Sequence, residues 1–298
     1  MLHNHKLSIV VLAFASLLFS QAVTAKPKVI KEERSLYQNV FVEDDGDKRC
    51  LKFSVKRRTS SQSCMFKSQP KKVVFNYTKF AMSALVFKTK PERVLIIGLG
   101  GGTLSNNLLD MYPEIEIDNV EIDPAVVSVA VEYFGFKQTE KVKTHIQDGR
   151  IFIKRAQRKR LQYDLIILDA FNGEYIPEHL LTKEFLQESK SLLNENGVLI
   201  ANTFSSSKLY HHESATYHYV FGDYYSIKKS ENVGNRVLVV GHSLLTEDTI
   251  AKNAKLLKQP LATFGVDIEE TFEYIEFEPS FKSEYRILTD QYSPANLL

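Results

Sequence analysis

Residues 94–109 read VLIIGLGGGTLSNNLL: an apolar run, four glycines within five positions, and a stretch with helical spacing. An apolar run that stops at glycine predicts a buried strand, and glycines allow a tight turn and close approach of the backbone to a ligand. A dinucleotide fingerprint would need a glycine at the sixth position counted from Gly98, and that position is Thr103. The G-x-G-x-G spacing of Gly98, Gly100 and Gly102 therefore favours an adenosyl-sulfonium ligand at the N-terminus of the following helix.

Strands and helices alternate on the C-terminal side of this stretch. Apolar runs at 115–123, 141–148, 163–171 and 197–204 are separated by helical patterns at 103–112, 124–134, 151–159 and 180–197. This alternation predicts a parallel sheet with helices on both faces. The runs at 224–230 and 235–243 are separated by only a short polar turn, which permits a hairpin but not a helical crossover. An antiparallel pair at a sheet edge is typical of Rossmann-like, class I methyltransferase-type α/β folds.

A small β domain is expected before this core. Residues 36–44 and 49–55 alternate apolar and polar side chains around the turn DDGDKR, which predicts paired strands. Helical spacing follows at 74–87, before Pro91. We therefore expect three segments: a signal peptide at 1–25, a small N-terminal β domain at 26–80 and a Rossmann-like domain at 81–298.

Each of the next three core strands ends in a carboxylate. Because the carboxyl ends of parallel strands form the ligand cleft of such sheets, these side chains should meet near the glycines. Glu121, roughly 20 residues past the glycines, is placed to accept from ribose hydroxyls. Asp148, followed by Gly149, is placed to accept from an adenine amino group. Asp169 would hold or deprotonate an attacking amine, because an ammonium has no lone pair to attack carbon. The alternative for each acid alone is a solvated strand end or, for Asp169, a cap on the following loop.

Several of these segments together resemble the spermidine synthase-like, or polyamine aminopropyltransferase, family. The resemblance rests on Tyr37-Gln38, GLGGGTL (98–104), NVEID (119–123), QDGR (147–150), YDLIILDAFNG (163–173), LLTKEF (180–185) and LTDQYSP (288–294). It covers nearly all of the chain after the leader and is specific in its order. It implies an N-terminal strand domain, a Rossmann-like core, a homodimer, and decarboxylated S-adenosylmethionine as co-substrate.

The resemblance also implies roles for individual residues. Glu121 would hold the ribose, Asp148 the adenine, and Asp169 would be the catalytic acid. Gln38 would lie near the co-substrate and Tyr77 near the amine. The expected activity is transfer of an aminopropyl group to a small-molecule amine, as in polyamine biosynthesis.

The chain departs from the family pattern at three places. Thr103 stands where the family has an aspartate facing the aminopropyl ammonium, and Asn172 replaces a second aspartate near the substrate. The acids before Tyr77 are replaced by Val74, Phe75 and Asn76. A dicationic amine in a partly dry cleft needs carboxylates to offset its desolvation, so the sequence predicts a cleft short of them.

Thr103 also leaves the co-substrate open. The carboxylate of S-adenosylmethionine would suit N–H donors at a helix N-terminus, whereas the decarboxylated form presents only an ammonium there. Ordinary S-adenosylmethionine, or methylthioadenosine alone, therefore remains an alternative. Two rival functions follow: a methyltransferase that uses the same cleft, and a non-catalytic nucleoside or polyamine binder.

The first 25 residues have the layout of a secretory signal peptide. A short basic start is followed by the apolar run LSIVVLAFASLLF and by small residues, with Val23 and Ala25 before the expected cleavage point. The apolar run is shorter than the roughly 20 residues that span a bilayer, so we expect export to a periplasm or medium without stable membrane insertion. The alternative is an uncleaved anchor.

Cys50 and Cys64 are the only cysteines, and both lie in the part of the chain that we expect to be exported. An oxidising compartment favours a disulfide between them, and the alternative is two separate thiols.

Net charge and histidine spacing bear on two further classes of protein, nucleic-acid binders and metalloproteins. A formal net charge of +2 gives no strong attraction to nucleic acid. In the stretch YHHESATYHYV (210–220), His212 and Glu213 are adjacent and lack the i, i+4 spacing of two metal ligands on one helix face. We expect no metal site there, and read the stretch as an exposed helix or loop.

Overall fold

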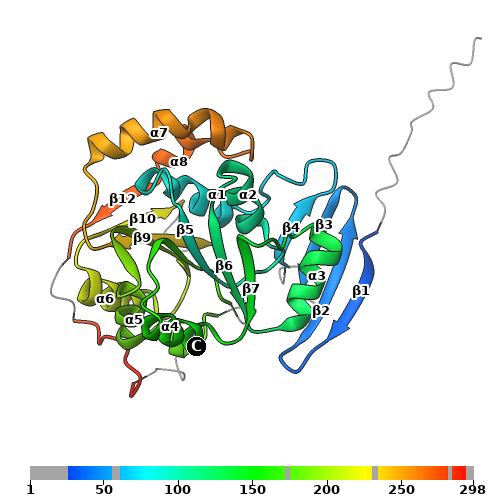
Figure 1. The fold of residues 1–298 in the computed structure, drawn as a ribbon, viewed down its shortest axis with the longest axis horizontal. Helices are drawn as coiled ribbons and strands as arrows, with labels where there is room; N and C mark the ends of the chain where they lie inside the picture. The colour runs from blue at the N-terminus through cyan, green and yellow to red at the C-terminus, as the bar shows by residue number, and fades with distance from the viewer. Residues whose placement is uncertain (1–25, 56–60, 172–174, 230–233, 281–283, 293–298) are drawn as a thin grey trace, which may run out of the picture.

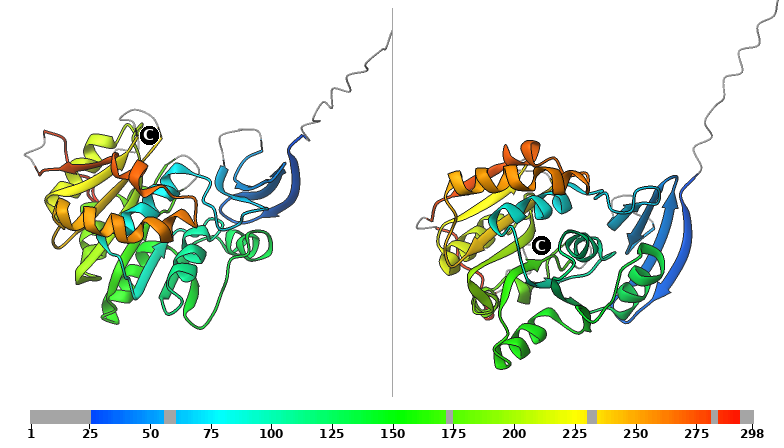
Figure 2. Two further views of the ribbon diagram at one scale, coloured as in Figure 1. Left: turned by 90° about the horizontal axis from the view of Figure 1, so that it is seen from above. Right: turned by 45° about the horizontal axis from the view of Figure 1, so that its top comes forward.

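The computed structural model describes residues 26–55, 61–171, 175–229, 234–280 and 284–292. They form two sheets that lie side by side, with the N-terminal sheet at one end of the molecule in all three views (Figures 1 and 2). The smaller sheet has the order β1-β2-β3-β4 and the larger β12-β10-β11-β9-β8-β5-β6-β7. The Rossmann-like fold with a separate N-terminal sheet is confirmed.

The larger sheet is parallel in its centre and antiparallel at one edge. The strands β5 to β9 run parallel, whereas β11 is antiparallel to β9, β10 to β11, and β12 to β10. The antiparallel pair of β10 and β11 confirms the hairpin expected around residue 234. The strands of the larger sheet are β5 (Arg93–Ile97), β6 (Glu116–Glu121), β7 (Val142–Ile146), β8 (Tyr163–Leu168), β9 (Leu193–Phe204), β10 (Tyr224–Lys228), β11 (Asn235–Gly241) and β12 (Ile275–Glu278).

Helices cover both faces of this sheet, and each face has its own apolar cluster. Figure 1 shows α1 and α7 on one face of the sheet and α4, α5 and α6 on the other. The first cluster includes Ile96 of β5 and Leu257 of α7. The second includes Phe152 of α4, Phe185 of α5 and Tyr217 of α6. The helices are α1 (Asn76–Ser83), α2 (Thr103–Met111), α3 (Pro124–Phe134), α4 (Gly149–Arg158), α5 (Lys183–Lys190), α6 (Tyr210–Phe221), α7 (Glu247–Ala262) and α8 (Ile268–Phe272), with short 3-10 turns η1 (Ala84–Phe87) and η2 (Glu178–Leu180). No described helix combines the length and the apolar character needed to cross a membrane.

The N-terminal sheet packs on α3. Its strands are β1 (Lys28–Arg34), β2 (Asn39–Asp45), β3 (Lys48–Lys52) and β4 (Ser61–Phe66), all antiparallel. Val42 and Leu51 pack against Val126 and Val129 of α3 in a cluster of their own. The helix thus joins the sheet to the core through apolar contacts.

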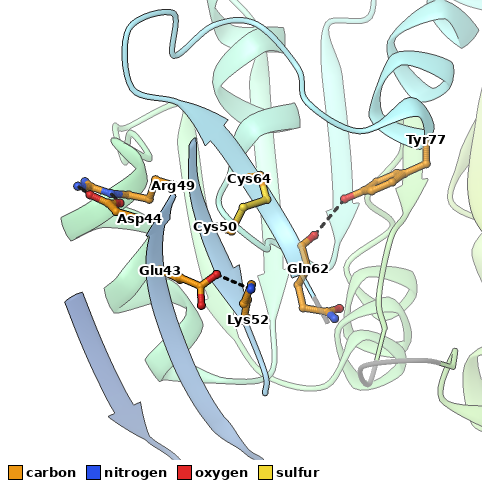
Figure 3. The surroundings of a disulfide bond; sticks show 8 residues. All are labelled: Glu43, Asp44, Arg49, Cys50, Lys52, Gln62, Cys64 and Tyr77. Carbon is orange, nitrogen blue, oxygen red and sulfur yellow. Dashed lines mark hydrogen bonds and ion pairs between the residues drawn. A yellow bond between two sulfur atoms is a disulfide. The ribbon is translucent and has the colours of Figure 1, made fainter. Parts of the chain in front are cut away.

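A disulfide joins the middle of β3 to β4. Cys50 and Cys64 are directly opposite each other in the ladder, with Cα atoms 4.1 Å apart (Figure 3). The expected pairing is confirmed. On the same sheet, Lys52 pairs with Glu43 at 2.5 Å and Arg49 with Asp44 at 2.8 Å.

Two local expectations are wrong. The helix expected over 180–197 ends at Lys190, because Leu193 already pairs with Tyr163 as the first residue of β9. Burial of Leu192 and Leu193 beside β8 outweighs the local helical spacing. The segment 210–220 is a helix, but its inner face, including Glu213 and Tyr217, is buried rather than exposed.

Candidate active site

A cavity of about 320 Å³ opens at the carboxyl ends of β5, β6, β7 and β8. This volume lies at the lower end of the range for small-molecule sites. The N-terminal sheet closes one side of it through Gln62, Ser63 and Cys64. The predicted residues that line it are Gln38, Tyr77, Gly98, Gly100, Thr103, Glu121, Asp148, Gly149 and Asp169.

The glycines of the loop have different reasons to be glycine. Gly98 has φ +97°, and a Cβ there would lie 2.3 Å from the carbonyl oxygen of Asp169. Gly102 has φ +74°, and its Cβ would lie 2.5 Å from the Phe136 ring. Gly102 is not among the residues that line the cavity, so packing against Phe136 explains this glycine better than ligand contact does.

Glu121 supports the glycine loop from below. One carboxylate oxygen accepts from the Leu99 N–H at 3.0 Å and the other from the Asp123 N–H at 3.0 Å. Burial raises the pKa of Glu121, and these backbone donors oppose that rise. The carboxylate is thus held at the end of β6, facing the cavity; its role toward a ribose stays a prediction.

Asp148 is the N-cap residue of α4 and pairs with a histidine that the sequence analysis missed. Its Oδ1 accepts from the Ile151 N–H at 2.9 Å, and its Oδ2 lies 2.8 Å from His179 Nε2. The hydrogen bond to His179 lowers the pKa of Asp148. No motif indicated this partner, because η2 reaches Asp148 only through tertiary packing. Gly149 packs on Ile97, whose Cγ2 would lie 2.5 Å from an added Cβ.

Asp169 lies at the end of β8 and is half-buried. Asn202 Nδ2 donates to its Oδ1 at 2.8 Å, and burial raises the pKa of Asp169 to about 7. The sequence analysis missed Asn202, although Leu168 pairs with Ala201 in the parallel ladder, which places the next residues side by side. A carboxylate with this pKa can exchange a proton near neutral pH.

Tyr77 lies close enough to Asp169 for the charge of that carboxylate to affect the pKa of the phenol. Burial, together with that charge, raises the pKa of Tyr77 far above its usual range, so the phenol stays protonated. Its hydroxyl donates to the Gln62 carbonyl oxygen at 3.4 Å (Figure 3). Gln38 lines the same cavity, with its backbone held by Ser35. Asn172 lies outside the described residues.

A second cavity of about 720 Å³ adjoins the first, and Asn202 lines it. Both cavities are lined by Gln62, Phe75, Tyr77 and Phe171. Asp169 on one side and its partner Asn202 on the other therefore mark the junction between the two cavities. Within the described ranges, no cluster of three or more His, Cys, Asp or Glu side chains is arranged to hold a metal.

Comparison with known proteins identifies the class. A sequence profile described as "Spermine/spermidine synthase domain" matches residues 75–229. The chain is 46% identical over 293 residues to the polyamine aminopropyltransferase of Vibrio vulnificus (strain CMCP6), covering 97% of this chain and 98% of that one. It belongs to the spermine/spermidine synthase family. The expected resemblance and the expected enzyme class, a polyamine aminopropyltransferase-like transferase, are confirmed.

The chain is also similar to two solved structures and to a methyltransferase. A probable spermidine synthase from Corynebacterium glutamicum matches with TM-score 0.69 and 20% identity, over 90% of this chain and 98% of that one. Human methyltransferase-like protein 13 in complex with SAH matches with TM-score 0.58 and 26% identity, over 76% of this chain and all of that one. The eEF1A lysine and N-terminal methyltransferase of Bos taurus is 38% identical over 120 residues, which is 38% of this chain and 17% of that protein.

Proposed function

We propose that the first cavity binds decarboxylated S-adenosylmethionine and that Asp169 prepares an amine, entering from the second cavity, to receive the aminopropyl group. One observation carries this proposal: a carboxylate with a pKa near 7 lies where the two cavities meet. The residues present suit a nucleoside, because Glu121 and Asp148 offer carboxylate acceptors from two neighbouring strand ends.

In the proposed reaction Asp169 takes one proton from the acceptor ammonium, which frees a lone pair on nitrogen. Nitrogen then bonds to the methylene carbon next to sulfur, the carbon–sulfur bond breaks, and its electron pair neutralises the sulfonium. Asp169 releases its proton to solvent afterwards. Asn202 keeps the carboxylate oriented, and the protonated Tyr77 forms part of the wall between the cavities. Alignment of the two reactants supplies much of the rate in a transfer of this kind.

Methyl transfer from S-adenosylmethionine is the second candidate. It is supported by Thr103, which lines the first cavity where an acid would meet an ammonium, and by the partial similarity to methyltransferases. Product analysis separates the two functions. Incubation with an amine and decarboxylated S-adenosylmethionine should release methylthioadenosine; release of S-adenosylhomocysteine from S-adenosylmethionine would favour methyl transfer. If calorimetry detects binding of neither nucleotide nor of methylthioadenosine at millimolar concentration, both candidates fail.

We further propose that the protein is exported and works as a homodimer. The composition of residues 1–25 and the disulfide support export, and the family resemblance supports the dimer. Mass spectrometry of the natively produced protein should find Lys26 at the N-terminus, and sedimentation should give twice the chain mass.

A further inference from the structure

The turn η2 brings a histidine to the wall of the first cavity. His179, the middle residue of η2, lines this cavity together with Pro177 and Leu180. No motif of the sequence marks it, and the proposed reaction does not use it. Its side chain is 47% exposed, so burial alone does not hold the imidazole in one position. What the ring can do therefore depends on the group that it contacts.

His179 and the backbone of α4 hold the Asp148 carboxylate from two different elements. Oδ2 lies 2.8 Å from Nε2 of His179, and Oδ1 accepts from the Ile151 N–H at 2.9 Å. The hydrogen bond to His179 holds the pKa of Asp148 below its usual range, so the carboxylate is ionised at neutral pH and can only accept. Nε2 therefore carries the proton, and the imidazole is the donor.

A second donor fixes the orientation of this carboxylate. The last torsion of an aspartate side chain is broad, so a carboxylate with a single partner can turn about it. With the Ile151 N–H on one oxygen and His179 on the other, the plane of the Asp148 carboxylate is set. A carboxylate offers about four acceptor positions, so the same oxygens can also accept from a ligand. Asp148 lines the first cavity, where such a ligand would lie.

The C-terminal segment holds η2 next to the start of α4. Arg150, in the first turn of α4, donates to both carboxylate oxygens of Asp290 at 2.7 Å. Thr182, which follows η2, donates to the same carboxylate at 2.7 Å. Asp290 thus joins the two segments that carry Asp148 and His179. These contacts keep the imidazole within hydrogen-bond distance of the carboxylate although its ring is half exposed.

We propose that His179 is a positioning residue for adenine: it orients the Asp148 carboxylate so that an oxygen accepts from the amino group of the base. This inference rests on the proposed function, because it places the adenine of the co-substrate at Asp148. His179 would then determine how strongly the site prefers a base with an amino group at that place. A base with a carbonyl oxygen there would meet the carboxylate with a second acceptor, and a fixed carboxylate could not turn away from it.

The test compares the Kd of methylthioadenosine with that of methylthioinosine, in which a carbonyl oxygen replaces the amino group. The unsubstituted protein should bind methylthioadenosine roughly tenfold to a hundredfold more tightly. His179→Leu should weaken methylthioadenosine about fivefold to twentyfold and change methylthioinosine less than about threefold, because only the first donates to Asp148. His179→Gln keeps an N–H donor at its Nε2 atom and should restore most of the preference.

A double substitution separates positioning from a direct contact with the ligand. If His179 acts through Asp148, His179→Leu should change the Kd of methylthioadenosine less than about twofold in a protein that already carries Asp148→Asn. Full additivity of the two losses would overturn the inference, because the histidine would then act independently of the carboxylate.

The remaining outcomes distinguish the possible failures. Equal weakening of both nucleosides in His179→Leu would show a structural role and overturn the inference. Equal affinity of the unsubstituted protein for both nucleosides would overturn it too, while the proposed function stands. Binding of neither nucleoside at millimolar concentration would instead overturn the proposed function. If His179→Leu does not fold, His179→Asn replaces it: its amide ends short of Asp148, so an undiminished preference in that variant would contradict the inference.

Discussion

The two sheets of this protein make opposite contributions to the same site. The core sheet supplies the ionisable groups at its strand ends, Glu121, Asp148 and Asp169, each held by backbone or side-chain donors. The N-terminal sheet supplies the neutral cover of the first cavity through Gln62 and Ser63, and its own charges pair with each other (Figure 3). The comparison teaches that chemistry and closure are carried by separate sheets, so they should fail separately.

Asp169→Asn should have the largest effect on activity. The amide cannot accept a proton from an ammonium, so kcat should fall by about 10²–10⁴. Because the amide keeps the shape of the carboxylate and the proposed nucleoside acceptors are Glu121 and Asp148, the Kd for methylthioadenosine should change less than about threefold, or roughly 0.6 kcal/mol. Glu195→Gln, at an exposed position, is the matched control. Retained turnover in Asp169→Asn would remove Asp169 from the role of base.

The double substitution Cys50→Ser with Cys64→Ser should destabilise the N-terminal sheet. The disulfide closes a loop with a sequence separation of 14, and its loss should lower the free energy of unfolding by about 3 kcal/mol. Since Ser63 and Cys64 line the first cavity, nucleotide affinity should also fall, whereas the pH dependence of turnover should not move. Denaturant titration with and without reductant measures the first effect.

Only the protein with both cysteines should respond to reductant. A reductant effect of the same size in the double variant would show that it acts elsewhere. Two free thiols in the natively produced protein would also remove the support that the disulfide gives to export.

The dependence of kcat/KM on pH should reflect the ionisation of Asp169 in the core sheet and no group of the N-terminal sheet. Asp169 must be ionised to take a proton, so kcat/KM should fall about tenfold per unit of pH below the pKa of about 7. Asn202→Leu removes the donor that favours the carboxylate, which should move this limb to higher pH by on the order of one unit. Rate measurements between pH 5 and pH 9 define this acid limb for the unsubstituted enzyme and for Asn202→Leu. A limb that moves down in Asn202→Leu would contradict the assigned hydrogen bond.

The sequence predicts the features that follow from the order of strands and helices, and it misses those that depend on tertiary packing. Alternation of strands and helices gives the order of the core, and strand ends of a parallel sheet must meet, so Glu121, Asp148 and Asp169 could be placed together. Asn202, His179 and the buried face of α6 depend on packing between segments far apart in the chain. No local spacing records such contacts.

The glycine loop shows the limit from the other side. Its pattern pointed to the place where Gly98 and Gly100 line the first cavity. The structure also relates Gly98 to the Asp169 backbone and Gly102 to the Phe136 ring. A motif can therefore locate a site even though one of its residues, Gly102, does not line the cavity.

Thr103→Asp should have the smallest effect, and it tests the boundary between the two candidate reactions. Thr103 lies in the first turn of α2 and lines the first cavity. An added carboxylate would attract the ammonium of decarboxylated S-adenosylmethionine and repel the carboxylate of S-adenosylmethionine, so the ratio of their Kd values should shift several-fold to about tenfold toward the decarboxylated form. Calorimetry with both ligands measures this ratio, and Thr103→Asn is the control of equal size without charge. An equal shift in Thr103→Asn would mean that shape rather than charge acts there. No shift in either variant would mean that the propyl end of the co-substrate lies away from α2, and the departure at Thr103 would then say nothing about which group is transferred.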